Sequence, residues 1–334
     1  MQLRPLLMSR RAFLAATGSA AAAGTTLTAG SRKLKIDLIK APSNLGLRPS
    51  PEGKIPGTDR AADVLIEQGL LKALPVKEVH SLHQLPYSRD PEPGTKLRNG
   101  SKIRAFNLEL ADAVAQSRRS GRFPLVVGGE CSNLLGGLLG IRRTGGHGLV
   151  HLDGHSDFLQ PSFYPPQFPL HSAAGMDLAL ATGRGEALLT KWPGIEGPLA
   201  EDADVFQLGE RYSPKPDGKI ELFAGTPISQ LSIQRLRRIG LAAAAGEIGT
   251  MLAVRSIRGA WLHVDTDVLD QSVMPAVDSP GTPGLMFDEL AWLIRAIMAT
   301  GRIGGADVAI YDPDLDPDRK VADQLVKCIA GAFG

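Results

Sequence analysis

Two short runs of the sequence are rich in side chains that can bind metal ions. The first is His151-Leu152-Asp153-Gly154-His155-Ser156-Asp157, and the second is His263-Val264-Asp265-Thr266-Asp267-Val268-Leu269-Asp270. Each run follows an apolar stretch typical of a buried strand, and the carboxyl ends of parallel strands are where α/β proteins bind ligands. On an extended backbone, Asp153, His155 and Asp157 would share one face, as would Asp265 and Asp267. We therefore expect the acidic side chains of both runs to meet in one crevice.

Carboxylates that converge in a crevice need a counter-charge, because burial and mutual repulsion would otherwise raise their pKa values. A divalent cation supplies this charge. Oxygen-rich ligation with one or two imidazoles favours Mn²⁺, with Zn²⁺, Fe²⁺ and Ni²⁺ as alternatives. Two close cations lower the pKa of a shared water and stabilise the charge of a hydrolytic transition state. The two runs together predict a dinuclear metal hydrolase, whereas a single aspartate would more often be a helix cap or turn residue.

The secondary structure around these runs decides whether they meet. Apolar stretches predict strands at residues 34–39, 123–127, 148–152, 204–208, 261–264 and 306–310. Apolar residues at helical spacing predict helices at 60–74, 103–119, 288–299 and 320–333, and segments 46–58, 85–101 and 158–170 contain the proline and glycine of loops. This alternation predicts one α/β domain over residues 31–334, with a parallel sheet covered by helices on both faces.

Residues 1–30 differ from the rest of the chain. They contain Arg4, Arg10 and Arg11, no acidic residue, and an alanine-rich stretch too short and too rich in Gly, Ser and Thr to predict a membrane span. The paired arginines resemble a twin-arginine export signal, so we expect a periplasmic or secreted protein. The alternative is a disordered tail on a cytoplasmic protein. The remaining chain is near neutral, which argues against nucleic acid as a partner.

Four motifs resemble those of the ureohydrolases, the family of arginase and agmatinase. The segment Gly128-Gly129-Glu130-Cys131-Ser132 is similar to Gly-Gly-Asp-His-Ser of that family, and Asp153-Gly154-His155-Ser156-Asp157 is similar to Asp-Ala-His-x-Asp. The run that begins at Asp265 resembles Asp-x-Asp-x-x-Asp-Pro, and Gly281-Thr282-Pro283-Gly284-Leu285 is similar to the glycine-rich motif that follows. The resemblance covers nearly all of residues 34–334, and segments 103–119 and 125–132 are most similar to the arginase branch.

This resemblance implies a three-layer α/β fold with a central, mostly parallel sheet, and a site for two manganese ions. One ion would be held by Cys131, Asp153, Asp157 and Asp265, and the other by Asp153, His155, Asp265 and Asp267. In the family, a metal-activated hydroxide attacks a guanidino or amidino compound and urea is released; Asp157 would orient that hydroxide. Family members form trimers or hexamers, so the resemblance also implies a homo-oligomer.

Two residues depart from the family pattern at the expected metal and substrate contacts. Cys131 stands where the family has a histidine ligand, and a thiolate there would favour Zn²⁺, Fe²⁺ or Ni²⁺ over Mn²⁺. A few relatives that act on hydroxylated arginine are similar in this respect; the alternative is a buried apolar cysteine beside a weak or empty metal position. Ile310 stands where the family has the glutamate that holds the guanidinium; Asp312 and Asp314 are the candidate substitutes, but neither is at the matching position.

The loop after Asp157 is a third departure, because it is more apolar and aromatic than the family pattern. The family's proton-shuttle histidine aligns with His171 by distance from Asp157, but with Ala174 if the following glycine is matched. His171 is therefore either a proton carrier or a surface histidine. These departures leave two alternatives to the hydrolase: a metal-binding or ligand-binding protein without turnover, and an amide or imide hydrolase on the same scaffold.

Overall fold

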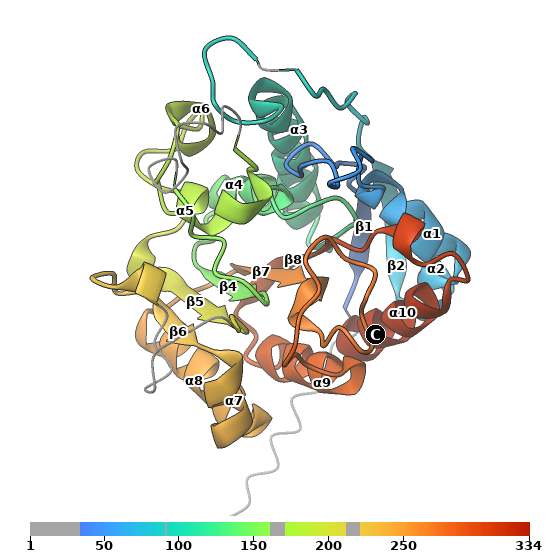
Figure 1. The fold of residues 1–334 in the computed structure, drawn as a ribbon. Coiled ribbons are helices and arrows are strands. Elements are labelled where there is room, and N and C mark those ends of the chain that lie inside the picture. Colours follow the sequence, from blue (N-terminus) through green and yellow to red (C-terminus); the bar gives the residue numbers. More distant parts are fainter. Residues whose placement is uncertain (1–33, 91, 161–170, 212–220) are drawn as a thin grey trace, which may run out of the picture. The chain divides into compact units, whose positions relative to one another are not determined.

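The computed structural model describes residues 34–90, 92–160, 171–211 and 221–334 (Figure 1). The predicted export signal at residues 1–30 lies outside the described residues, as does most of the predicted loop 158–170. Among the helices of the described part, none combines the length and the apolar character needed to cross a membrane.

Eight strands form one sheet in which every neighbouring pair is parallel. Their order is β2-β1-β3-β8-β7-β4-β5-β6. The strands are β1 (Ile36–Lys40), β2 (Val76–Ser81), β3 (Phe123–Val127), β4 (Leu149–Leu152), β5 (Val205–Leu208), β6 (Ser229–Leu231), β7 (Ala260–Asp265) and β8 (Ile303–Ala309). The parallel sheet predicted from the apolar runs is confirmed.

Helices cover both faces of this sheet, which gives three layers (Figure 1). One face carries α3 (Gly100–Arg119), α4 (Asn133–Arg142), α5 (Asp177–Ala181) and α6 (Ala187–Thr190). The other carries α1 (Ala61–Glu67), α2 (Leu70–Ala73), α7 (Ile233–Ile239), α8 (Leu241–Val254), α9 (Phe287–Met298) and α10 (Lys320–Phe333). Successive residues of a strand point to opposite faces of the sheet. Leu125 packs against the helices of the α1 and α10 face, and Val126 packs against those of the α3 and α4 face.

Several elements were not predicted, each for a local reason. Strand β2 is an edge strand whose side chains are mostly exposed, so it lacks a continuous apolar run. Helix α4 contains three glycines, which predict turns rather than helix; a Cβ on Gly137 would lie 2.2 Å from the Trp261 ring, so close packing requires glycine there. The helix predicted at 60–74 is broken into α1 and α2 by Gly69, whose φ is +98°.

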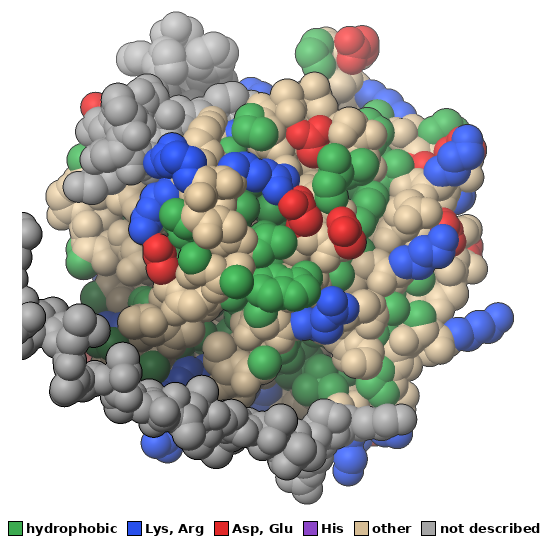
Figure 2. All heavy atoms as spheres, turned by 90° about the horizontal axis from the view of Figure 1, so that it is seen from below, with side chains coloured by type: hydrophobic (Ala, Val, Ile, Leu, Met, Phe, Trp, Pro, Cys, Tyr) green, Lys and Arg blue, Asp and Glu red, His purple; other side chains and the backbone are tan. Residues whose placement is uncertain are grey.

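The surface agrees with the near-neutral composition of the described chain. On the face drawn in Figure 2, acidic and basic side chains are interspersed with apolar ones.

Candidate metal centre

Five strands that are neighbours in the sheet lead into the segments that carry the candidate residues. In sheet order, β3 leads to Cys131, β8 to Ile310, β7 to Asp265, β4 to Asp153 and β5 to Glu210. Because all these strands are parallel, the segments meet at one edge of the sheet, where ligands of α/β proteins bind.

Two glycines allow the chain to turn sharply at the end of β3. Gly128 and Gly129 have φ values of +88° and +80°, which are accessible to glycine at little cost. The turn holds the next strand in place, because the Gly129 carbonyl accepts a hydrogen bond of 3.0 Å from the Ile310 backbone N–H. The buried Glu130 carboxylate accepts a hydrogen bond of 2.9 Å from the Ser132 backbone N–H, which stiffens the loop that carries Cys131.

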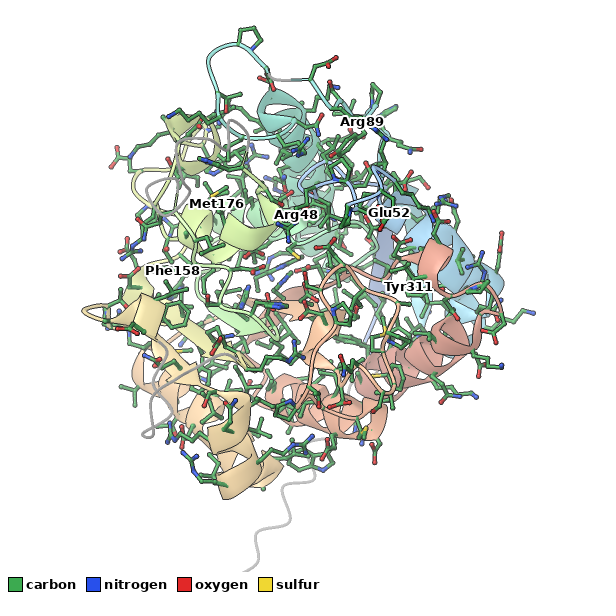
Figure 3. All side chains as sticks on the ribbon, in the orientation of Figure 1. Arg48, Glu52, Arg89, Phe158, Met176 and Tyr311 are labelled. Atoms are coloured by element: carbon green, nitrogen blue, oxygen red, sulfur yellow. The ribbon has the colours of Figure 1, made fainter. Side chains whose placement is uncertain are left out.

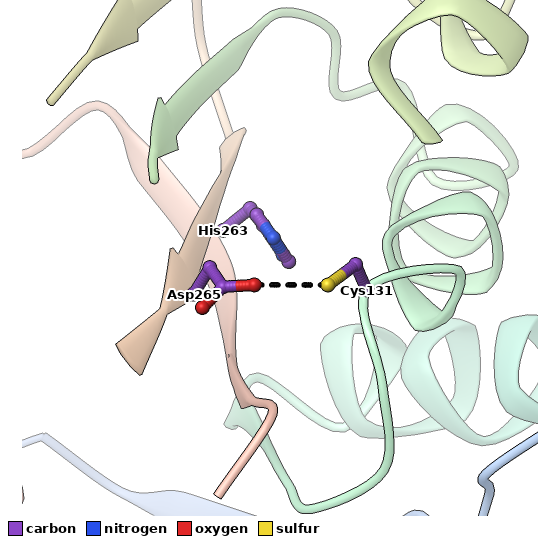
Figure 4. A group of neighbouring side chains, drawn as sticks. All are labelled: Cys131, His263 and Asp265. Atoms are coloured by element: carbon purple, nitrogen blue, oxygen red, sulfur yellow. Dashed lines mark hydrogen bonds between the residues drawn. The ribbon is translucent and has the colours of Figure 1, made fainter. Parts of the chain in front are cut away.

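The predicted ligands come together at this edge. The Nδ1 atom of His155 lies 2.8 Å from Asp267 Oδ2 and 3.6 Å from Asp153 Oδ1. The Cys131 thiol, on the loop before α4, donates to Asp265 Oδ2 on β7 at 2.9 Å (Figure 4). The structure therefore brings both acidic runs and the cysteine loop to one place.

The route by which they converge differs from the prediction. Strand β4 ends at Leu152, and Asp157 has a φ of +42°, so Asp153, His155 and Asp157 do not alternate on an extended backbone. Instead, Asp153 Oδ1 accepts a 2.6 Å hydrogen bond from the His155 N–H, and Asp265 Oδ1 accepts one of 2.7 Å from the Asp267 N–H. Aspartate side chains that bond two residues ahead stabilise turns, and these turns aim the carboxylates. The prediction of a shared extended face was wrong.

Burial and like charges dominate the electrostatics of this group. Burial first, and then the neighbouring carboxylates, raise the pKa values of Asp157 and Asp265 well above the ordinary range. Burial alone would lower the pKa of His155, but its hydrogen bonds to Asp153 and Asp267 raise it to about 12. Burial alone would raise the pKa of Asp267, but the hydrogen bond to His155 lowers it. Without a cation, protons must therefore supply the charge that these side chains need.

The donor set fits a divalent cation. Asp153 Oδ2 is buried and has no hydrogen-bond partner within the described ranges, so an acceptor is left for an ion. Burial and the Asp265 charge raise the pKa of the Cys131 thiol well above its usual value, so the thiolate requires a cation beside it. Ligand atoms of Asp153, His155 and Asp267 lie within 4.8 Å of one another, as do those of Cys131, His263 and Asp265.

A cavity of about 560 Å³ opens onto these residues. Its lining includes Cys131, His155, Asp157, Asp265 and Asp267. Its wall also includes two basic side chains, Arg48 and Arg98, two acidic ones, Glu210 and Asp278, and the apolar Ile310; Arg48 is labelled in Figure 3. The cavity thus offers groups of both charges to a small polar molecule.

The residues discussed as replacements for missing family contacts do not lie in this cavity. Asp312 Oδ2 accepts a 3.0 Å hydrogen bond from the Gly57 N–H, and Asp314 pairs with Arg60 at 2.7 Å. Ile310, by contrast, lines the cavity, is 2% exposed and has a φ of +76°, which is rare for a β-branched residue. No carboxylate therefore stands at the position where the family has its guanidinium-binding glutamate.

Ala174, the residue that one of the two alignments places at the shuttle-histidine position, lies in the cavity wall. His171 is 3% exposed, and its backbone bonds to Lys96 O at 2.7 Å and to the Arg98 N–H at 2.9 Å. It is therefore neither a surface histidine nor among the described residues that line the cavity. Its role as a proton carrier stays a prediction.

Sequence reasoning missed two groups around the site. The buried Arg211 donates to the backbone carbonyls of Asp267, Leu269 and Pro283, the last two at 3.2 Å, and so ties the second acidic run to the loop at 281–284. Behind the ligands lies a fully buried group of four side chains: His151, Asp177, His263 and Asp307. The only signal for this group was a histidine inside each of two apolar strands.

Comparison with known proteins is consistent with this geometry. A family model described as the arginase family matches residues 56–333. An arginase of Bacillus caldovelox is 29% identical over 262 residues, with 78% of this chain and 83% of the relative covered. Human arginase-1 is 27% identical over 287 residues, with 84% and 85% covered. The native structure of the Bacillus caldovelox arginase aligns with a TM-score of 0.78 and 26% identity, with 90% of this chain and 98% of that chain covered.

Proposed function

The chain belongs to the arginase family, and from that premise we propose that it is a dinuclear metal hydrolase that cleaves a C–N bond of a guanidino or amidino compound and releases urea. The observation that carries this proposal is the convergence of six ligand-type side chains around one cavity. They are Cys131, Asp153, His155, Asp157, Asp265 and Asp267.

Two divalent ions would share these ligands. One would be held by Cys131, Asp153, Asp157 and Asp265, and the other by Asp153, His155, Asp265 and Asp267. Bound there, the ions would supply Lewis acidity and a water of lowered pKa near neutral pH. We propose Mn²⁺ for the oxygen-rich position, with Zn²⁺, Fe²⁺ or Ni²⁺ competing where Cys131 contributes sulfur.

The side chains of the cavity then decide what is bound and how. Asp157 lies in the cavity wall, where its carboxylate would accept a hydrogen bond from the attacking water and orient it. Glu210 and Asp278 are the acidic groups of the described wall outside the ligand set. Burial raises the pKa of Asp278, and Arg48 lies close enough to oppose this rise. We propose that Glu210 faces the cationic end of a substrate and that Arg98 pairs with a carboxylate at its other end. This arrangement favours a guanidino acid over an amine such as agmatine.

One observation favours a second candidate, a metal-binding or ligand-binding protein without turnover. Ile310 presents an apolar side chain to the cavity where the family pattern has a glutamate. Loss of a charge-assisted contact to the guanidinium removes an interaction of about 1.5–3 kcal/mol. A chain without this contact could still bind metal ions and a small molecule.

A urea-release assay separates the two candidates. The protein would be loaded with Mn²⁺, Ni²⁺ or Zn²⁺ and offered arginine, hydroxyarginine, agmatine and guanidinobutyrate, with Asp267→Asn as the inactive control. Urea from at least one substrate, absent in the variant, supports the hydrolase. No urea from any of the four, with two ions bound per chain, removes the hydrolase and leaves the binding protein. Light scattering tests the trimer or hexamer that we propose for its assembly.

A further inference from the structure

A group of buried polar side chains lies next to the candidate metal centre, between strands β4 and β7 and helix α5. His151 on β4 and His263 on β7 are register neighbours, and their rings stack with centroids 4.8 Å apart at 24°. Asp177, the first residue of α5, faces both rings, and Asp153 adjoins His151. All four side chains are 0% exposed. We call these residues the β4–β7 cluster.

Six buried polar atoms of this cluster have no hydrogen-bond partner among the described residues. Within the described part of the chain, none is found for either ring nitrogen of His151, either carboxylate oxygen of Asp177, His263 Nε2 or Asp153 Oδ2. Buried polar atoms in native proteins are almost always bonded, and an exception calls for an unseen partner. A single water would not satisfy this many atoms together with two carboxylate charges.

The separations within the cluster exceed hydrogen-bond lengths and are close to those between ligands of one metal ion, with Asp177 using a different oxygen towards each imidazole. His151 Nε2 lies 3.4 Å from Asp177 Oδ1 and 3.6 Å from Asp153 Oδ2, and His263 Nε2 lies 3.7 Å from Asp177 Oδ2. Each of these exceeds the usual hydrogen-bond length. Ligands about 2.0–2.1 Å from a tetrahedral zinc ion lie about 3.3–3.4 Å from one another. The donor atoms of His151, Asp153 and His263 also lie within 4.8 Å of one another.

A neighbouring carboxylate orients one of the histidines towards the cluster. His263 Nδ1 lies 2.6 Å from Asp307 Oδ2, and the other oxygen of Asp307 accepts a hydrogen bond from the Trp261 indole N–H. Metal-binding histidines typically make this contact to a carboxylate through the nitrogen that does not bind the metal. The contact leaves His263 Nε2 as the ring nitrogen that faces Asp177.

We propose that His151, Asp153, Asp177 and His263 hold a further divalent ion of the zinc class, in a closed structural site behind the dinuclear centre. The two imidazoles and Asp153 offer donor atoms within 4.8 Å of one another, and Asp177, which approaches each imidazole with a different oxygen, would complete the set. Such an ion would fix β4, β7 and the start of α5 relative to one another. His151, Asp177 and His263 lie outside the dinuclear set, whereas Asp153 would be shared between the two sites.

Metal stoichiometry of the full-length protein tests this proposal. After equilibrium dialysis against Zn²⁺ and then metal-free buffer, mass spectrometry should find three zinc ions per wild-type chain. His151→Phe and Asp177→Asn should each retain two. The matched control is His80→Gln, which should retain three: His80 also lies in a carboxylate group, but Arg122 already pairs with Asp37 and Glu78 there, each at 2.8 Å.

Co²⁺ gives a second readout, because tetrahedral Co²⁺ absorbs strongly in the visible range. The band should weaken in His151→Phe and Asp177→Asn and persist in His80→Gln. Equal metal content in wild type and both cluster variants would overturn the proposal. One ion in wild type and none in His151→Phe would support it and refute the dinuclear centre instead.

Far-ultraviolet circular dichroism would show whether each variant is folded. Should either fail to fold, wild-type crystals grown with Zn²⁺ decide the question. An anomalous peak between His151 Nε2 and His263 Nε2 supports the site, and no peak there refutes it.

Discussion

Replacement of Ile310 by glutamate tests how a substrate lies in the cavity. Ile310 is 2% exposed, lines the cavity and is held through its backbone N–H by the Gly129 carbonyl. This bond fixes the backbone, so Ile310→Glu would direct a carboxylate into the cavity without moving the loop. If a guanidinium binds there, the new carboxylate would form a charge-assisted pair with it.

The size of the gain follows from the energy of such a contact. Hydrogen bonds to charged groups contribute about 1.5–3 kcal/mol, which corresponds to roughly a ten- to one-hundred-fold rise in kcat/KM. The variant also adds a carboxylate near Asp157 and Asp265, whose pKa values burial already raises. We therefore expect the metal-free variant to be less stable than wild type, and metal loading to restore most of the difference.

The assay is urea release by metal-loaded protein with arginine and guanidinobutyrate as substrates. Ile310→Gln is the matched control, because it has nearly the same shape as the glutamate without its charge. The reasoning requires Ile310→Glu to exceed Ile310→Gln by the stated factor. Equal kcat/KM values for the two variants, with both folded and loaded, would refute a guanidinium at this position.

Four further predictions concern the metal, the pH, the packing and the substrate. Cys131→His should shift the preferred ion from Zn²⁺ towards Mn²⁺, measured by competitive dialysis, and an unchanged preference would argue against Cys131 as a ligand. The folded metal-free protein keeps raised pKa values at Asp157 and Asp265, so above about pH 4 it binds more protons than the unfolded chain. Its unfolding free energy should therefore fall as the pH rises towards those pKa values. Calorimetry with and without metal at pH 5 and pH 8 should show that stabilisation by the metal grows with pH. Gly137→Ala should destabilise the protein by about 1–3 kcal/mol in urea unfolding, because the new Cβ would lie 2.2 Å from Trp261. Gly246→Ala on α8 is the control: a Cβ there would have no atom within 4 Å, so it should stabilise the protein by up to about 1 kcal/mol. Arg98→Gln should raise KM for guanidinobutyrate but not for agmatine, which has no carboxylate, and an equal effect on both would exclude a carboxylate contact.

The sequence allowed the sheet and the general location of the site to be predicted, because both depend on local signals. Buried parallel strands read as short apolar runs, and acidic residues directly after two such runs identified the edge where Asp153 and Asp265 meet. The path of the chain beyond each strand could not be predicted. Aspartate adopts a positive φ more often than most residues, but still rarely, so the turn at Asp157 was mistaken for extended backbone.

Contacts between distant segments were beyond sequence reasoning for a different reason. Asp177 lies 26 positions after His151 and 86 before His263, and nothing in its neighbourhood marks it as their partner. The glycines of α4 predict turns until the side chains packed against them are known, such as the Trp261 ring at Gly137 and Val114 at Gly140. Both features depend on packing in the completed fold.

The central claim is that the carboxylates gathered at the edge of the sheet coexist because they share two divalent ions. Crystals of the full-length protein grown with Mn²⁺, measured at a wavelength where manganese scatters anomalously, test it most directly. The account predicts two neighbouring peaks, each within bonding distance of both Asp153 and Asp265. An anomalous map with no peak between these two residues, from protein shown to be folded, would contradict it.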